Sequence, residues 1–130
     1  MSEEPKPGAI VHIEFAVKDA AAVKKVKDFY GKIFGWTFQD VPEFNYTLFQ
    51  APSGPGGGIG PAQPGQAIGM TNYLYVVSID ETVKRIEKAG GKILSPKVEV
   101  PGQGWLINFL DPAGVAMALW QSTPHEHPHS

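Results

Sequence analysis

The chain contains no cysteine among its 130 residues. Disulfide bonds, cysteine nucleophiles and cysteine-based zinc sites are therefore excluded. Long hydrophobic runs are also missing, because no segment approaches the roughly 20 apolar residues that span a bilayer. The first residues, MSEEPKPGA, are charged and contain proline, unlike a targeting segment. These features predict a soluble, unprocessed protein that is cytoplasmic and has no membrane partner.

Basic residues are few and scattered. The chain has 11 Lys and Arg against 13 Asp and Glu, which gives a formal net charge of −2. A nucleic-acid-binding surface needs a basic patch or stripe, because it must neutralise phosphates. We therefore expect no nucleic-acid partner. With 42% hydrophobic residues, the chain can bury a core without a metal or disulfide bond.

The second half of the chain repeats the first. At an offset of 60 residues, the Gly-Lys-Ile of 31–33 returns at 91–93, and the Phe-x-x-Pro-x-Gly of 49–54 returns at 109–114. The offset is 59 near the start of each half, where one residue has been inserted. Such a tandem duplication predicts two similar modules that share one pocket.

Hydropathy patterns predict the elements of the first half. Residues 11–17, VHIEFAV, alternate apolar and polar residues as in a half-buried strand. Asp19 can cap the helix that follows, which carries an apolar stripe and ends at Gly35. Three further strands are expected at 36–39, at 46–50 and near Ile59.

The second half predicts the same order. A strand at 73–77 precedes a helix at 78–89, in which Ser78 and Glu81 have capping-box spacing. Three strands follow, near 92–94, 105–110 and 115–120. Both halves therefore read as βαβββ modules of a single domain over 1–130. The first module covers about 9–60 and the second about 70–121, and 122–130 is expected to be a flexible tail.

Five segments between residues 10 and 121 carry a family resemblance. They are VHIEFAV, DFYGKIFGW, TNYLYVVSIDE, PKVEVPGQGW and DPAGVAMALWQ, the last of which is close to the pattern DP-x-GN-x-x-E-LW. Together they resemble the glyoxalase, bleomycin-resistance and extradiol-dioxygenase superfamily, also called vicinal oxygen chelate proteins. The branch related to lactoylglutathione lyase is the most similar. This resemblance implies an α+β fold in which two βαβββ modules form a curved mixed sheet around a cup.

The resemblance also locates a metal site. In that family a divalent metal in the cup is held by four ligands from the first and last strand of each module, typically His or Gln and then Glu. The matching positions here are His12, Gly58, Thr71 and Ala118. Only His12 is a good ligand, because first-row divalent metals prefer imidazole and carboxylate donors. We therefore expect no family metal site and no cofactor.

Strand alternation places candidate catalytic residues on the cup side. His12 and Glu14 lie two residues apart on one strand face. Such a pair can share a proton, and burial raises the pKa of a carboxyl group, so acid–base chemistry is possible. In the alternative interpretation the two side chains only satisfy each other's hydrogen bonds, as buried polar groups do.

Aromatic residues supply candidate walls for a ligand pocket. Small-molecule sites typically combine aromatic walls with a few polar groups. The alternative is that these aromatic residues belong to the core or to a dimer interface. The candidate pocket residues are Thr71, Tyr73, Tyr75, Trp105, Ala118 and Trp120.

Two other motifs are weaker. The glycine-rich run 54–60, GPGGGIG, lacks the Lys-Ser/Thr of a phosphate-binding loop and is interpreted as a closely approaching or bent edge strand. His125, His127 and His129 could chelate a metal, but a flexible tail is a poor catalytic platform.

Three functions remain open. The leading hypothesis is a protein that binds a small-molecule ligand, acting as a binding protein or a metal-independent enzyme. The alternative is a metal-dependent lyase or isomerase of the lactoylglutathione lyase type, using His12, Glu14 and an unforeseen ligand. The third is an interaction or scaffold domain. We also expect a homodimer, because exposed edges such as the glycine-rich fourth strand favour pairing.

Overall fold

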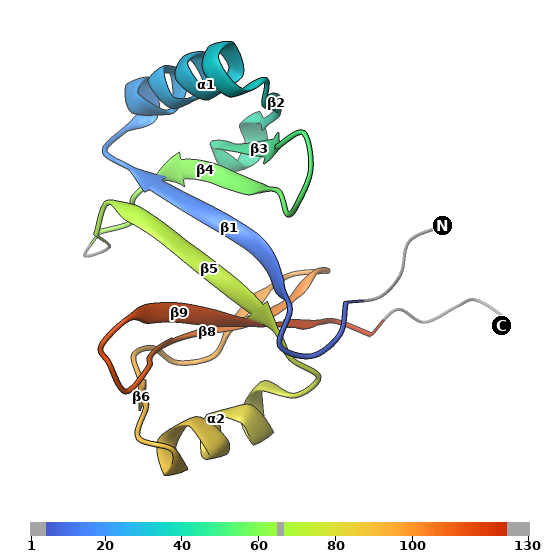
Figure 1. Cartoon of the computed structure of the whole chain (residues 1–130), viewed down its shortest axis with the longest axis vertical. Helices are drawn as coiled ribbons and strands as arrows, with labels where there is room; N and C mark the ends of the chain where they lie inside the picture. The colour runs from blue at the N-terminus through green and yellow to red at the C-terminus, as the bar shows by residue number, and fades with distance from the viewer. Residues whose placement is uncertain (1–4, 65–66, 125–130) are drawn as a thin grey trace, which may run out of the picture. The chain divides into compact units, whose positions relative to one another are not determined.

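A computed structural model describes residues 5–64 and 67–124 of the chain (Figure 1). The chain divides into two compact units. The first unit is Ile10–Tyr73, and the second is Leu74–Ser130 together with Met1–Ala9. The tail histidines at 125, 127 and 129 lie outside the described residues, so their expected metal binding stays a prediction.

The first unit has the predicted βαβββ order (Figure 1). Its strand order is β2-β3-β4-β1, in which β4 runs parallel to β1 and antiparallel to β3. β2 pairs antiparallel with β3. The elements are β1 (Ile10–Val17), α1 (Ala20–Phe34), β2 (Thr37–Val41), the short 3-10 helix η1 (Pro42–Phe44), β3 (Tyr46–Gln50), β4 (Gly57–Pro61) and β5 (Gly69–Tyr75), whose last two residues belong to the second unit.

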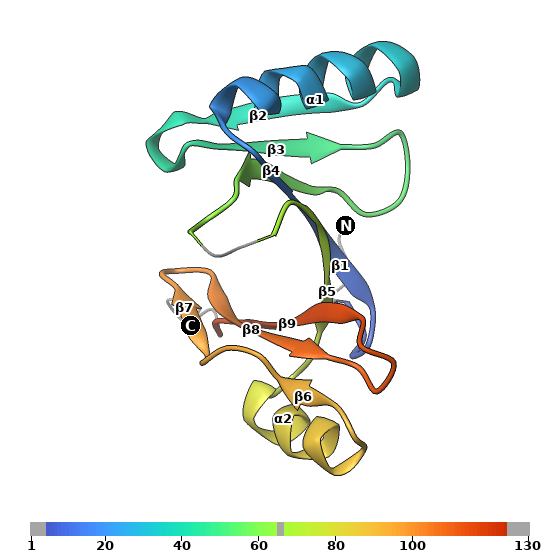
Figure 2. The same cartoon turned by 90° about the vertical axis from the view of Figure 1, so that its left-hand side faces the viewer.

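Helix α1 begins and ends where its caps predict. The Asp19 carboxylate accepts a hydrogen bond from the Ala22 amide at 2.9 Å, and the Gly35 amide donates to the Gly31 carbonyl at 3.1 Å. Gly35 has a φ of 74°, a left-handed conformation that glycine adopts without strain. The helix so bounded lies against β1, β2 and β4 of its unit (Figure 2).

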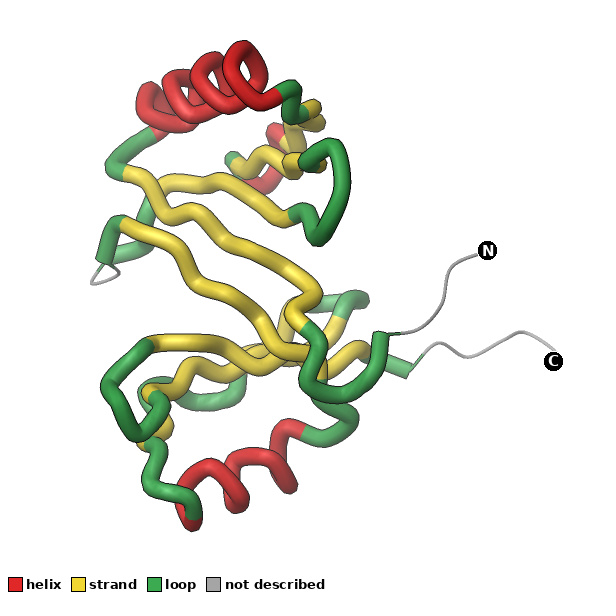
Figure 3. The backbone as a smooth tube through the Cα atoms, viewed as in Figure 1, coloured by secondary structure: helices red, strands yellow, loops and turns green. Residues whose placement is uncertain are grey.

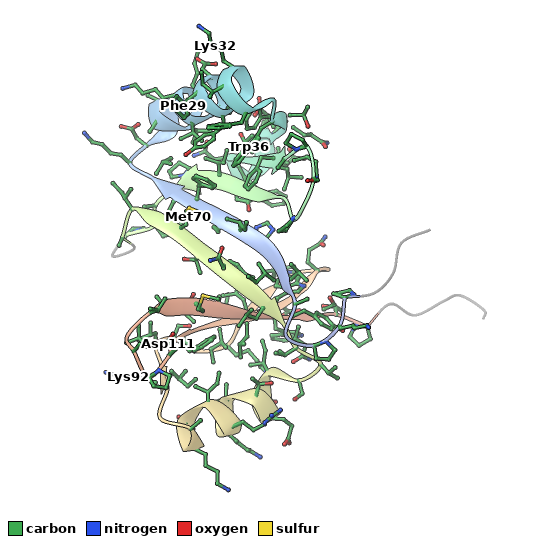
Figure 4. The ribbon with its side chains drawn as sticks, in the orientation of Figure 1. Phe29, Lys32, Trp36, Met70, Lys92 and Asp111 are labelled. Carbon is green, nitrogen blue, oxygen red and sulfur yellow. The ribbon has the colours of Figure 1, made fainter. Side chains whose placement is uncertain are left out.

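The core of the first unit lies between α1 and its strands. Ile59 of β4 is fully buried, and Val17 and Phe49 pack with it. Trp36 stacks on the Phe49 ring, with ring centroids 4.5 Å apart, and is labelled in Figure 4. These contacts bury the apolar faces of β1, β3 and β4. The other face of the same strands is left for polar residues.

The second unit repeats the arrangement around the last two residues of β5. Its core packs α2 on β8 and β9 through the buried residues Ile79, Ile107, Phe109 and Leu119. The Ser78 hydroxyl accepts from the Glu81 amide at 3.2 Å, as the capping box predicts. The other elements are α2 (Ile79–Lys88), β6 (Lys92–Ile93), β7 (Val98–Val100), β8 (Gly104–Leu110) and β9 (Ala116–Ser122), and β6, β7 and β9 all pair antiparallel with β8.

The DPAG segment forms the turn between β8 and β9. The Asp111 carboxylate accepts from the Ala113 amide at 2.8 Å and from the Val115 amide at 2.9 Å. Figure 4 labels Asp111 at this turn. The acidic residue therefore closes the hairpin between β8 and β9.

The glycine-rich strand differs from its prediction. β4 is internal, because its Gly58 lies opposite Leu48 of β3 on one side and Glu14 of β1 on the other. Our interpretation of this strand as an exposed edge is therefore wrong, and it gives no support for dimer formation. The glycines allow the backbones of β4 and β1 to approach closely, since a Cβ on Gly57 would overlap the Ile13 carbonyl.

The two modules make the fold class α+β, as predicted (Figure 3). Helix α1 has 15 residues and α2 has 10. Neither helix combines the length and apolar character needed to cross a bilayer within the described ranges 5–64 and 67–124.

Core burial generates a stability prediction. Replacing the fully buried Ile59 by Ala leaves a cavity and should lower the free energy of unfolding by about 2–5 kcal/mol. The matched control is Ile33→Ala on α1, where the side chain is 56% exposed and the expected change is within about 0.5 kcal/mol. Urea denaturation measures both. Equal losses for the two variants would contradict the assignment of the core.

Candidate functional site

Strand register assembles one polar face in the first unit. Glu14 of β1 lies opposite Gly58 of β4, and Gly58 lies opposite Leu48 of β3. Because successive residues of a strand alternate between faces, these side chains point away from α1, toward which Ile13 and its alternate neighbours are directed. We call this surface, formed by His12, Glu14, Tyr46, Leu48, Gly58 and Gly60, the polar face.

Three side chains of the polar face form one hydrogen-bonded cluster. The Tyr46 hydroxyl donates to Glu14 Oε1 at 2.6 Å. His12 Nε2 lies 2.9 Å from the same carboxylate oxygen and 3.1 Å from Tyr46 Oη. The His12 and Glu14 side chains remain 33% and 20% exposed to solvent. We refer to these residues as the His12–Glu14–Tyr46 cluster.

Tyr46 reaches Glu14 by crossing β4. Neighbouring strands lie about 4.8 Å apart, so a side chain on β3 must span roughly 10 Å to meet one on β1. A Cβ on Gly58 would overlap the Tyr46 phenol, and a Cβ on Gly60 would lie 3.2 Å from Tyr46 Cδ1. Glycine at these two positions therefore makes the path for the ring.

The sequence did not predict Tyr46 as a site residue. Its partners are 32 and 34 residues away, and no local spacing joins residues so distant. The available signal was the alternation of glycine at 58 and 60. Two glycines on one strand face indicate that something bulky lies across that face.

Tyr73 completes the aromatic surroundings of the cluster. Its ring lies edge-on to the His12 imidazole, with centroids 5.4 Å apart and planes at 81°. The structure thus brings the predicted residues His12, Glu14 and Tyr73 together within the first unit. Thr71, on the same strand as Tyr73, is half-buried.

Both phenols stay protonated at ordinary pH. Burial, followed by the nearby Glu14 charge and its hydrogen bond, raises the pKa of Tyr46 well above the usual range. Burial and the Glu14 charge raise the pKa of Tyr73 to about 12. The phenols are therefore neutral hydrogen-bond donors.

The remaining candidate pocket residues belong to the second unit. Tyr75 donates its amide hydrogen to the Ala9 carbonyl at 2.8 Å, while Ala118 is completely buried. Trp120 lies over Gly104, where a Cβ would meet its ring at 2.8 Å. Trp105 packs against the buried core residues instead, and the Lys97 ammonium lies 5.1 Å from its ring centroid.

Strand alternation places Trp105 on the opposite face of the sheet from Ala118 and Trp120. Trp105 shares its face of β8 with Ile107, whereas Leu106, on the other face, lies opposite Trp120. The uncertain register around the preceding glycines prevented this assignment from the sequence alone.

The donors present do not fit the family's metal. No group of three or more His, Cys, Asp or Glu side chains that could hold a metal occurs in the described part of the chain. Gly58 offers no donor, and the Tyr46 phenol fills the space its side chain would occupy. His12 and Glu14 supply two donors, fewer than a stable divalent site requires, and the neutral Thr71 hydroxyl is a weak third.

Comparisons with known proteins agree with this fold. A sequence profile of the Glyoxalase/Bleomycin resistance protein/Dioxygenase superfamily matches residues 9–119. The chain is 28% identical over 130 residues to "Putative glyoxylase CFP32" of Mycobacterium tuberculosis, covering 94% of this chain and 49% of that protein. It is 31% identical over 137 residues to the anthracycline biosynthesis protein DnrV of Streptomyces peucetius, covering 88% and 47%. The chain therefore spans about half the length of the curated relatives it matches.

Solved structures share the fold. Methylmalonyl-CoA epimerase from Mycobacterium tuberculosis superposes with a TM-score of 0.64 at 15% sequence identity, covering 95% of this chain and 94% of the epimerase. At such low identity the match describes the backbone architecture alone.

The path of Tyr46 over Gly58 predicts a strong coupling. Gly58→Ala should lower the free energy of unfolding, because the new methyl group overlaps the phenol. The same change in a Tyr46→Ala background should lower it only slightly, because the ring is then absent. The expected coupling energy is about 1–3 kcal/mol. Urea denaturation of the four proteins in this double-mutant cycle measures it. Equal costs of Gly58→Ala in both backgrounds would show that the ring lies elsewhere.

The raised pKa of Tyr73 predicts a loss of stability in alkali. An unfolded phenol titrates near pH 10, while folded Tyr73 titrates at about 12, so the folded chain retains a proton that the unfolded chain has released. Stability is therefore fully present below pH 10 and falls as the pH rises from 10 to 12. Tyr73→Phe should flatten this fall, which urea denaturation across the interval measures. An unchanged slope would contradict the burial of the phenol.

Proposed function

Because the chain belongs to the Glyoxalase/Bleomycin resistance protein/Dioxygenase superfamily, we propose that it binds a small organic molecule at the His12–Glu14–Tyr46 cluster without a metal. It acts in this proposal as a binding protein or as a metal-independent enzyme. The superfamily fold supports a small-molecule role, and the chemistry of the cluster supports the departure from metal chelation.

One observation carries the proposal. The Tyr46 hydroxyl lies where a side chain on Gly58 would project, and it donates to Glu14 Oε1 at 2.6 Å. A phenol that stays protonated is a poor ligand for a divalent cation, and this one also engages the carboxylate that a metal would need. The position that the family assigns to a metal ligand thus serves a hydrogen-bonded cluster.

The cluster can bind, orient and exchange a proton with a ligand. Glu14 and His12 offer a carboxylate and an imidazole to a ligand's hydrogen-bond donors, and either group can accept a proton from an acidic C–H or O–H. Tyr46 holds the carboxylate in place through its short hydrogen bond. If a reaction occurs, it is therefore proton transfer of the lyase or isomerase kind, with Glu14 or His12 as the base.

The names of the relatives support a small organic ligand. One relative is named as a glyoxylase and another as an anthracycline biosynthesis protein. Both names concern small-molecule chemistry, and we extend only that class of ligand to this chain. The relatives are about twice as long, so their activities do not transfer with their names.

Metal loading separates this proposal from a metal-dependent lyase. After incubation with Zn²⁺, Mn²⁺ or Ni²⁺ and removal of free metal, elemental analysis should show substoichiometric metal that His12→Ala does not reduce. The tail histidines are a separate possible source, so the measurement is repeated with His125, His127 and His129 all replaced by Ala. One equivalent of metal that survives this triple replacement and disappears in His12→Ala would overturn the proposal.

A further inference from the structure

The charge of Glu14 has no permanent counterion in the structure. Its only ion-pair partner among residues 5–64 and 67–124 is His12, which is charged only when protonated. The lysines paired in this unit bond elsewhere: Lys24 with Asp28, and Lys27 with Asp40. The cluster therefore carries a negative charge in a half-buried position whenever the carboxyl group is ionised and the imidazole neutral.

The hydrogen atoms of the cluster can be assigned from its distances. Tyr46 has one hydroxyl hydrogen, and the shortest contact, 2.6 Å to Glu14 Oε1, uses it. His12 Nε2 then faces two acceptors, Glu14 Oε1 at 2.9 Å and Tyr46 Oη at 3.1 Å, so Nε2 carries the imidazole hydrogen. The neutral ring is left with Nδ1 as an acceptor.

The unused positions of the cluster are therefore acceptors. Glu14 Oε1 already receives two hydrogen bonds, while no partner is recorded for Glu14 Oε2 or His12 Nδ1 in the described part of the chain. A ligand group that complements these atoms must donate hydrogen bonds and preferably carry positive charge. A carboxylate or phosphate would instead meet acceptors and a like charge.

We propose that the cluster binds the protonated amine of an organic ligand, with the ammonium group hydrogen-bonded to Glu14 Oε2 beside the His12 ring. This assignment rests on the proposed function and names the chemical class of its ligand. An ammonium group supplies three donors and the missing positive charge, whereas a hydroxyl group supplies one donor and no charge. No deprotonation or bond cleavage is needed for this recognition.

Aromatic rings beside the carboxylate favour the same ligand. Tyr73 lies edge-on to His12 with centroids 5.4 Å apart, and the Tyr46 ring crosses the strand next to Glu14. Neutral aromatic rings attract organic cations through their electron-rich faces and also pack against the apolar part of a ligand. The raised pKa values of both phenols keep the rings neutral.

Three matched probes test the proposal. Benzylamine, benzyl alcohol and benzoate share one ring and differ in the charge and donors of the attached group. Titration of each into isotope-labelled protein, followed by NMR, should show benzylamine shifting the His12 ring signals at lower concentration than benzyl alcohol, and benzoate leaving them unchanged. Glu14→Gln should raise the dissociation constant of benzylamine by roughly tenfold or more, because a charge-assisted hydrogen bond is lost.

A control variant tests whether the location of the lost charge matters. Glu81→Gln removes the same charge from an exposed side chain of α2, 74% accessible, and should leave benzylamine binding unchanged. Circular dichroism confirms that both variants fold. If Glu14→Gln does not fold, the ranking of the three probes on the unmodified chain still decides the question.

The outcomes distinguish this proposal from the function on which it rests. Benzyl alcohol or benzoate shifting His12 as strongly as benzylamine, with no effect of Glu14→Gln, overturns the amine assignment and leaves a small-molecule site. Benzylamine shifting signals only outside the cluster also overturns the assignment. Failure of a broad panel of small organic molecules to shift His12 overturns the proposed function as well.

Discussion

The hydrogen bond between the Tyr46 hydroxyl and the Glu14 carboxylate is the interaction on which the chemistry of the first unit depends. It joins β3 to β1 across an intervening strand, which is possible because the strand between them presents glycine on that face. The bond fixes the carboxylate, brings His12 Nε2 within reach of both oxygens, and occupies the space of a metal ligand. One contact thus sets the geometry of the cluster and fills the space that a side chain at position 58 would need.

The fold was largely readable from the sequence because its signals are local. The cap residues Asp19 and Ser78 lie within three residues of their partners, and the predicted bounds of the second helix differ from the observed ones by one residue at each end. The duplication then gave the same order of elements twice, once from each half of the chain. The short strand Val98–Val100 was missed, because its alternation covers three residues only, fewer than the roughly four to eight from which a strand is recognised.

The site was only partly readable, because its decisive contact is not local. Alternation along one strand was enough to pair His12 with Glu14. The third member of the cluster comes from another strand, and its position depends on the register of β3 and β4, which composition does not encode. The glycine-rich run carried the information in a form that resembled an exposed edge. Trp105 fell on the core side for a similar reason, since its face depends on the register of β8 with β9.

The fit between Gly58 and Tyr46 also bears on how such a protein can change over generations. A carboxylate at position 58, gained alone, would collide with the phenol. Loss of the phenol alone would remove the donor that holds Glu14 and leave a gap over the glycines. Each single step is unfavourable, and only the paired change restores a consistent site. The two residues are therefore expected to change together, because either change alone disturbs the cluster.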